Sequence, residues 1–243
     1  AVVGSLTTFV SLGLGTLIRE MGVAPRIVTG HDYRSYSLSI KQALTLGLIE
    51  AGFEVHDIGL ALSPVAYFAQ FALDIPCVAM VTASHNENGW TGVKMGANKP
   101  LTFGPEEMGR LKDIVLNGKF NPQPGGKLVR VEGMRERYIA DVTKGVKISR
   151  KLKVVAACGN GAAGAFAPDA LRAMGVEVID MDTNLDYNFP KYNPNPEDHE
   201  MLVSMGQAVK EHGADLCVGF DGDGDRCGVV DDKGEEIFAD KIG

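Results

Sequence analysis

Short apolar runs alternate along the chain with stretches in which apolar residues recur at helical spacing. The run from Cys77 to Thr82 (CVAMVT) is almost entirely apolar, which is typical of a central strand buried on both faces. Other apolar runs predict strands at 26–29, 54–58, 153–157, 176–179 and 215–220. Amphipathic stretches predict helices at 37–51, from 63 onward, and at 105–116, 132–143, 166–174 and 197–212. The alternation predicts an α/β protein.

The pattern of strands and helices restarts after the basic stretch Lys144–Lys153. We therefore predict two consecutive α/β domains, with mainly parallel mixed sheets flanked by helices and joined by right-handed crossovers. The predicted domains are residues 1–147 and 148–243. The restart is compatible with an internal repeat, although the two halves share no clear residue pattern.

Composition and charge narrow the possible partners and the compartment. The formal net charge of -7 provides no overall basic field, which argues against nucleic acid or an anionic membrane as a partner. The apolar segment 9–18 has neither a preceding basic segment nor a following cleavage site, so we expect neither a signal peptide nor a membrane span. The cysteines form no Cys-x-x-Cys pair, which predicts reduced thiols and a cytoplasmic protein. They are Cys77, Cys158, Cys217 and Cys227.

A polar loop, Ala83–Gly89, follows the most apolar strand directly and contains Ser84. Ligands of open α/β sheets bind beyond the carboxyl ends of strands, so this serine is well placed for chemistry. Its hydroxyl needs a nearby base or metal to become a nucleophile. His85 is adjacent, but neighbours in an extended segment point in opposite directions, so it need not be that base. On composition alone, an ordinary polar turn is the favoured interpretation.

An acidic loop, Asp221-Gly222-Asp223-Gly224-Asp225, follows the apolar run Leu216–Phe220. The two glycines allow the backbone to curl, so that all three carboxylates can face one point. Carboxylate oxygens of this kind suit magnesium. The alternative is an acidic hairpin turn, since Asp-Gly is a favoured turn pair. Three like charges within five residues favour the cation site.

Two other classes of site contain a similar acidic motif. An EF-hand loop requires Gly at its sixth position and Glu at its twelfth, where this chain has Arg226 and Asp232, so we reject it. A phosphotransferase of the haloacid dehalogenase type would use Asp221 as its nucleophile. The Thr or Val usual two residues beyond the second Asp is Asp225 here, so this match is poorer and stays an alternative.

Basic residues near both loops could bind phosphate. Arg226 adjoins the acidic loop, where its guanidinium could bind a phosphoryl group in a bidentate manner. Lys94 follows the serine loop and could act as a point charge or, with a lowered pKa, as a base. A further polar loop, Gly30–Ser35, either contributes orientation or is an ordinary connection.

Together these motifs resemble the α-D-phosphohexomutases, which include phosphoglucomutases, phosphomannomutases and phosphoglucosamine mutases. The resemblance rests on TASHN after a strand, a following Gly-x-Lys, and DGDGDR more than a hundred residues later. Further agreement comes from GHDYR at 30–34, CGNG at 158–161, FP at 189–190, NP at 195–196 and VVG at 2–4. The resemblance covers essentially the whole chain.

The resemblance implies a magnesium-dependent isomerase that moves phosphate reversibly between O1 and O6 of a hexose phosphate. It implies a phosphoserine, a hexose 1,6-bisphosphate intermediate and glucose 1,6-bisphosphate as activator. Ser84 matches the phosphorylated serine, whose phosphate completes the metal coordination by Asp221, Asp223 and Asp225. His85 matches a histidine lining the site, Lys94 a general acid or base, and Arg226 the arginine near the phosphoserine.

The departures from the family pattern concern the missing half and the serine loop. The family has four domains, and this chain resembles the first two, without the third domain's sugar-selecting loop or the fourth domain's phosphate-gripping loop. We therefore expect the C-terminal domains of the same protein as partners, and no mutase activity from these two domains alone. Glu87 stands where many members have Pro. The serine loop lacks an Asn-Pro step, which favours the phosphomannomutase/phosphoglucomutase group. An inactive metal-binding module stays an alternative.

Overall fold

A computed structural model of the chain describes residues 2–242 and separates into two compact units. The first unit contains the residues up to His31, Ser35–Thr82 and Thr91–Met134. The second unit contains Asp32–Arg34, Ala83–Trp90 and the chain from Arg135 onward. Two short loops of the N-terminal half, 32–34 and 83–90, are thus grouped with the C-terminal half.

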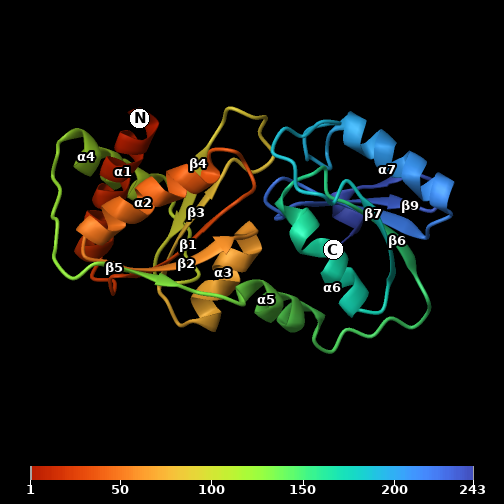
Figure 1. Cartoon of the computed structure of the whole chain (residues 1–243), viewed down its shortest axis with the longest axis horizontal. Helices are drawn as coiled ribbons and strands as arrows, with labels where there is room; N and C mark the ends of the chain where they lie inside the picture. The colour runs from red at the N-terminus through yellow and green to blue at the C-terminus, as the bar shows by residue number, and fades with distance from the viewer. Residues whose placement is uncertain (1, 243) are drawn as a thin grey trace. The chain divides into compact units, whose positions relative to one another are not determined.

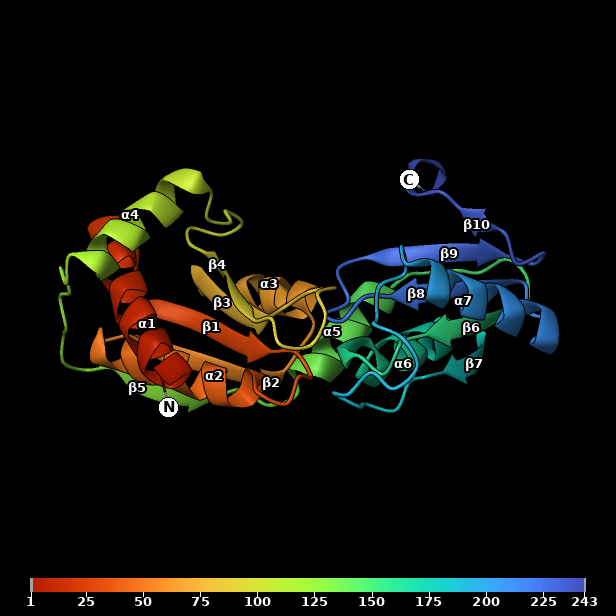
Figure 2. The same cartoon turned by 90° about the horizontal axis from the view of Figure 1, so that it is seen from above.

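The first unit is a mixed sheet with helices on both faces (Figures 1 and 2). Its strands lie in the order β4-β3-β1-β2-β5, with β4 antiparallel to β3 and the other neighbours parallel. The strands are β1 (Arg26–His31), β2 (Glu54–Leu60), β3 (Cys77–Thr82), β4 (Gly92–Gly96) and β5 (Lys127–Arg130). The helices are α1 (Val2–Glu20), α2 (Ser37–Glu50), α3 (Ser63–Ala72) and α4 (Pro105–Leu116).

Helices α1, α2 and α4 enclose one core of the first unit against alternate residues of the strands. Leu17, Leu44 and Phe53 are buried there together with Ile27 and Ala79 of β1 and β3. Helix α3 packs on the opposite face, against β1 and β3. This follows from the strand order: β1 to β2 and β2 to β3 run in opposite directions across the sheet, so right-handed crossovers put α2 and α3 on opposite faces.

The second unit has a sheet in the order β10-β9-β8-β6-β7, with β9 antiparallel to β8 and β10 antiparallel to β9. Its core lies under α7, where Met201, Met205 and Val209 pack on Val155 and Cys217. The strands are β6 (Lys153–Ala157), β7 (Glu177–Met181), β8 (Leu216–Phe220), β9 (Cys227–Asp231) and β10 (Glu236–Ile237). The helical segments are α5 (Met134–Thr143), η1 (Ala162–Ala165), α6 (Ala167–Ala173), α7 (His199–His212) and η2 (Ala239–Lys241).

The two units share one topology although they share no clear residue pattern. In each, three parallel strands are followed by an antiparallel fourth, giving the orders β4-β3-β1-β2 and β9-β8-β6-β7. The serine loop connects β3 to β4, and the acidic loop connects β8 to β9. The two candidate chemical motifs therefore occupy equivalent connections in the two sheets.

The predicted fold class is confirmed: both units are α/β, with mixed sheets flanked by helices. The structure differs from the prediction in adding α1, β4, β5 and the antiparallel strands of the second unit. It also groups α5 with the second unit, so the division falls at Met134 rather than at residue 147. Arg135 anchors this helix there, since its Nε donates to the carbonyl of Ala165 at 2.6 Å and its guanidinium pairs with Asp169.

Two further expectations concern membranes and thiols. Between residues 2 and 242 no helix combines the length and the apolar character needed to cross a bilayer. Cys77, Cys158 and Cys217 are buried and Cys227 is exposed, and all four are free thiols. Burial raises the pKa of the Cys77 thiol to about 12, so this sulfur is an inert core atom.

Candidate active site

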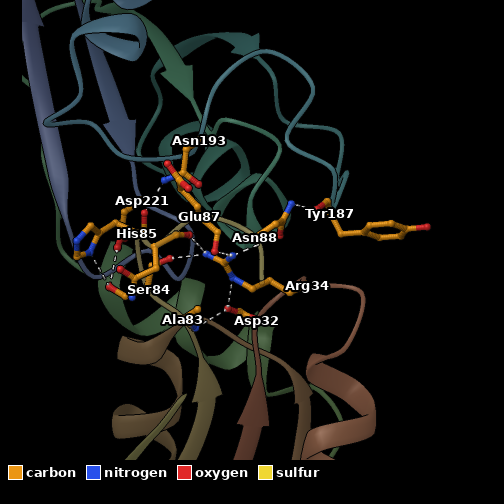
Figure 3. Close-up of polar contacts among 11 residues, drawn as sticks. Asp32, Arg34, Ala83, Ser84, His85, Glu87, Asn88, Tyr187, Asn193 and Asp221 are labelled. Atoms are coloured by element: carbon orange, nitrogen blue, oxygen red, sulfur yellow. Dashed lines mark hydrogen bonds and ion pairs between the residues drawn. The ribbon is translucent and has the colours of Figure 1, made fainter. Parts of the chain in front are cut away.

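Two loops of the first sheet meet because the strands that carry them are parallel neighbours. In the β1–β3 pair His31 lies opposite Val81, so the residues that follow, 32–34 and 83–90, leave the sheet side by side. Figure 3 shows the polar contacts that connect these two loops with Asp221, at the end of β8. All of the labelled residues belong to the second unit.

Ser84 contacts both His85 and the acidic loop (Figure 3). Its hydroxyl donates a hydrogen bond to Oδ2 of Asp221 at 3.3 Å, and its Oγ lies 3.4 Å from Nδ1 of His85. In an extended segment, as expected from the sequence, these two neighbouring side chains would point in opposite directions. Ser84 instead has a φ of 53°, in the left-handed region, and this turn brings the imidazole next to the hydroxyl. The carbonyl of His85 accepts a hydrogen bond from the Asn193 amide.

The acidic loop brings its three carboxylates together. Asp221, Asp223 and Asp225 each offer an oxygen, and these atoms lie within 4.8 Å of one another. Gly224 has a φ of +69°, which gives the loop the curl that a straight strand lacks. Oδ1 of Asp221 accepts hydrogen bonds from the backbone N–H groups of Asp225, at 3.0 Å, and of Arg226, at 3.2 Å. Asp221 is therefore fixed in place by the loop that it begins.

The electrostatics of this cluster favour a divalent cation. Asp221 and Asp223 are both 0% exposed. Burial, and next the charges of Asp223 and Asp225, raise the pKa of Asp221 from 3.8 to about 7. A group of hard oxygen donors whose ionisation is disfavoured by its own neighbours fits Mg²⁺, which prefers oxygen ligands and would offset the repulsion.

Neighbouring loops pack closely on the backbone of the acidic loop. The N–H of Ala162, which follows the CGNG turn and begins η1, donates to the carbonyl of Gly222 at 3.3 Å. A Cβ added at Gly222 would lie 2.5 Å from the backbone oxygen of Ser84. Since real Cβ atoms do not approach an oxygen so closely, only glycine fits between the serine loop and the acidic loop.

The polar loop Gly30–Ser35, expected either to contribute orientation or to be an ordinary connection, contains a buried polar pair. Asp32 and Arg34 of the GHDYR motif are buried and contact the serine loop (Figure 3). The sequence did contain an indication of this role, because a charged pair directly after a strand is unusual for a simple turn. The pair could not be interpreted without the neighbouring strand, because the serine-loop partners of Arg34 lie 50 to 54 residues away along the chain.

The two predicted basic residues have different surroundings. The guanidinium of Arg226 hydrogen-bonds the carboxylate of Glu197 through Nη1 at 3.2 Å, and its side chain is 38% exposed. Lys94 lies on β4 of the first unit, opposite Met80 of β3. In the second unit the Ser84 hydroxyl donates to Asp221 of the acidic loop, while the Arg226 side chain pairs with Glu197.

A cleft of about 490 Å³ opens beside the serine loop within the second unit. Its lining is acidic rather than basic, since Glu87, Asp198 and Glu200 all contribute to it. Such a lining repels phosphate, so we do not assign this cleft to a phosphorylated ligand. The remaining lining residues are Asn88, Asn188, Phe189, Tyr192, Asn193 and His199.

Comparison with known proteins identifies relatives over nearly the whole chain. A phosphomannomutase/phosphoglucomutase from Pseudomonas putida is 36% identical over 218 residues, which are 90% of this chain and 46% of that protein. A probable phosphoglucosamine mutase from Pyrococcus abyssi is 34% identical over 231 residues, which are 94% of this chain and 50% of that protein. The chain thus spans about half the length of the curated relatives it matches.

Family profiles and a solved structure agree with these relatives. A crystal structure of a phosphoglucomutase/phosphomannomutase family protein from Burkholderia thailandensis superposes with a TM-score of 0.90 at 29% identity, covering 98% of this chain and 53% of that one. Residues 5–122 match the profile of phosphoglucomutase/phosphomannomutase alpha/beta/alpha domain I, and residues 136–234 match that of domain II. The chain therefore belongs to the α-D-phosphohexomutase family and contains its two N-terminal domains.

Proposed function

We propose that this chain carries the phosphoserine loop and the magnesium loop of a phosphohexomutase that moves phosphate between O1 and O6 of a mannose or glucose phosphate. The observation that carries the proposal is the hydrogen bond from the Ser84 hydroxyl to Asp221, inside a cluster of three carboxylates. A serine beside buried carboxylates is poorly placed to receive an anionic phosphoryl group by itself. A divalent cation held by these carboxylates would make that position favourable.

Asp221, Asp223 and Asp225, with the phosphate on Ser84, would hold the magnesium ion. When bound, Mg²⁺ neutralises charge on the transferring phosphoryl group, which is the main requirement of this chemistry. The raised pKa of Asp221 agrees with this assignment, since a cation lowers it and restores the carboxylate. The backbone N–H groups of Asp225 and Arg226 keep one oxygen of Asp221 in place.

In the transfer step, a hydroxyl of the hexose phosphate attacks phosphorus while the bond from phosphorus to Ser84 Oγ breaks. The electron pair of that bond stays on Oγ, and the hydroxyl proton passes to a base, the role we assign to Lys94. We assign to His85, whose Nδ1 lies 3.4 Å from Oγ, the return of a proton to the released serine oxygen. The product is a hexose 1,6-bisphosphate, and the reverse step from its other phosphate returns the phosphoryl group to Ser84.

The whole reaction requires more than these two domains in our proposal. Because the chain spans about half the length of its relatives, we assign sugar selection and the grip on the second phosphate to C-terminal domains of the same protein. Glucose 1,6-bisphosphate would act as the activator that phosphorylates Ser84.

Phosphate mapping tests this proposal. The full-length protein is incubated with Mg²⁺ and glucose 1,6-bisphosphate, and its intact mass and phosphopeptides are measured. We expect one phosphoryl group on Ser84, absent in Ser84→Ala and retained in Ser204→Ala, which removes a helix-surface hydroxyl of the same unit. Phosphate on Asp221 that hydroxylamine removes would instead support the haloacid dehalogenase type. Absence of any covalent phosphate would overturn the mutase proposal.

A further inference from the structure

We propose that Arg34, held by Asp32, is a positioning residue that fixes the backbone of the serine loop so that the Ser84 hydroxyl faces the acidic loop. The inference rests on the proposed function, because it assigns a role in the phosphorylation of Ser84. It concerns residues that contact neither metal nor substrate in that proposal.

The guanidinium of Arg34 binds the serine loop along most of its length (Figure 3). Its Nη2 donates to the carbonyls of Ser84, at 3.1 Å, and Asn86, at 2.6 Å. Its Nη1 donates to the carbonyl of Glu87 at 3.1 Å and lies 3.4 Å from Oδ1 of Asn88. One side chain therefore satisfies three backbone carbonyls of a loop that has no regular secondary structure.

Asp32 fixes the arginine and the start of the loop at the same time. Its Oδ2 lies 3.3 Å from Nε of Arg34 and accepts the backbone N–H of Ala83 at 3.2 Å. Both side chains of the pair are 1% exposed. The Phe189 ring lies 5.3 Å from the centre of the guanidinium, within the range of a cation–π contact. The guanidinium thus has polar or aromatic contacts on several sides, which leaves its orientation little freedom.

The backbone conformation of Ser84 explains why the loop needs the hydrogen bonds from Arg34. A φ of 53° at a non-glycine residue is disfavoured and persists only where surrounding contacts impose it. The bond from Arg34 to the Ser84 carbonyl acts on the residue that has this conformation. A buried ion pair such as Asp32–Arg34 is by itself weak evidence for a stabilising role. Hydrogen bonds from this pair to the loop that carries Ser84 fit a positioning role.

The fork geometry of arginine is required for this arrangement. Two separate nitrogens reach the carbonyls of different residues of the loop, and a third lies 3.3 Å from Asp32. Lysine carries its donors on a single atom and keeps the charge without the fork. Arg34→Lys therefore separates the positioning role from the charge itself.

The test compares Arg34→Lys with Arg135→Lys in the full-length protein. Arg135 is a matched control, because it also binds a backbone carbonyl and an aspartate and lies 5.8 Å from a phenylalanine ring, that of Phe166. The rate of Ser84 phosphorylation is measured against the concentration of glucose 1,6-bisphosphate at saturating Mg²⁺. We expect Arg34→Lys to lower the maximal rate at least tenfold with an unchanged half-saturating concentration, and Arg135→Lys to change neither.

One further measurement and a second variant keep the test decisive. Amide hydrogen exchange in residues 83–90 should rise in Arg34→Lys and stay unchanged in Arg135→Lys. If Arg34→Lys does not fold, Asp32→Asn replaces it, with the same expected directions. Wild-type rate and exchange in the folded variant would overturn the positioning role while leaving the proposed function intact. Failure of the wild-type protein to phosphorylate Ser84 would overturn the proposed function instead.

Discussion

The hydroxyl of Ser84 and Oδ2 of Asp221 lie 3.3 Å apart although 137 residues separate them along the chain. The contact joins the loop after β3 to the loop after β8, the equivalent connections of two sheets with one topology. A phosphoryl group on Ser84 would therefore lie beside the carboxylates that we assign to magnesium.

Asp221→Asn should weaken magnesium binding at least tenfold, or by about 1.4 kcal/mol, because it removes a charge while keeping an oxygen for the N–H groups of Asp225 and Arg226. Isothermal titration with Mg²⁺ measures this. Asp182→Asn is the matched control, since Asp182 is also poorly exposed, at 8%, and binds Tyr192 and Lys191 instead. Equal losses in both variants would contradict the assignment.

Without magnesium, the stability of the second unit should fall as the pH rises from about 4 to about 7. The pKa of Asp221 is raised from 3.8 to about 7 by burial and by its acidic neighbours, so the folded state binds the proton more tightly than the unfolded state. Protonated Asp221 makes its full contribution to the free energy of unfolding below about pH 4. Loss of this contribution up to about pH 7 amounts to about 2–4 kcal/mol.

The melting temperatures of wild type and Asp221→Asn are measured in EDTA at each pH. Other titrating groups affect both proteins alike, so they cancel in the difference between the two melting temperatures. The difference, wild type minus variant, should decrease across this range and recover when Mg²⁺ is added. A difference that does not change with pH would show that the Asp221 pKa is not raised.

Gly222→Ala should destabilise the second unit by about 1–3 kcal/mol and displace the serine loop. The added Cβ would lie 2.5 Å from the backbone oxygen of Ser84, and backbone cannot move away as a flexible side chain can. Urea denaturation measures the stability, and hydrogen exchange in residues 83–90 detects the displacement. Gly109→Ala serves as control: nothing lies within 4 Å of its added Cβ, and its position inside α4 favours alanine.

Asp57→Asn should destabilise the first unit by about 2–3 kcal/mol, because it leaves the buried ammonium of Lys41 without its anionic partner. The two side chains are 4% and 19% exposed, and Asp57 also accepts the N–H of Gly59 at 2.8 Å. Lys41→Met should have a smaller effect, since the partly exposed carboxylate keeps that second bond. Denaturation of both single variants and of the double variant gives the coupling energy, and a value near zero would rule out the pair as a stabilising contact.

The local pattern of the sequence predicted most of the regular elements. The apolar run 77–82 forms β3 with every residue buried, and the predicted helix over 105–116 is α4. Gly52 follows the end of α2 with a φ of +76°, as a helix-terminating glycine should. These features depend on neighbouring residues only, so hydrophobic periodicity and turn chemistry are enough to predict them.

Elements whose formation depends on a distant partner were missed. Strands β4 and β9 are short and contain glycine, and they become strands because each pairs antiparallel with a neighbour already in a sheet. The grouping of α5 with the second unit likewise depends on contacts of Arg135 with Ala165 and Asp169. Neither dependence is visible in a local window of sequence.

For the candidate site, the sequence by itself determined the candidate residues: a serine after one buried strand, and three aspartates spaced by glycines after another. Only the tertiary structure decided that Ser84 adopts a left-handed turn, that its hydroxyl reaches Asp221, and that Arg34 holds its loop. Residue types and short spacings are local properties, whereas hydrogen bonds between loops depend on strand order and register. Parallel pairing of β1 with β3 brings Asp32 to Ala83, and no local pattern contains that pairing.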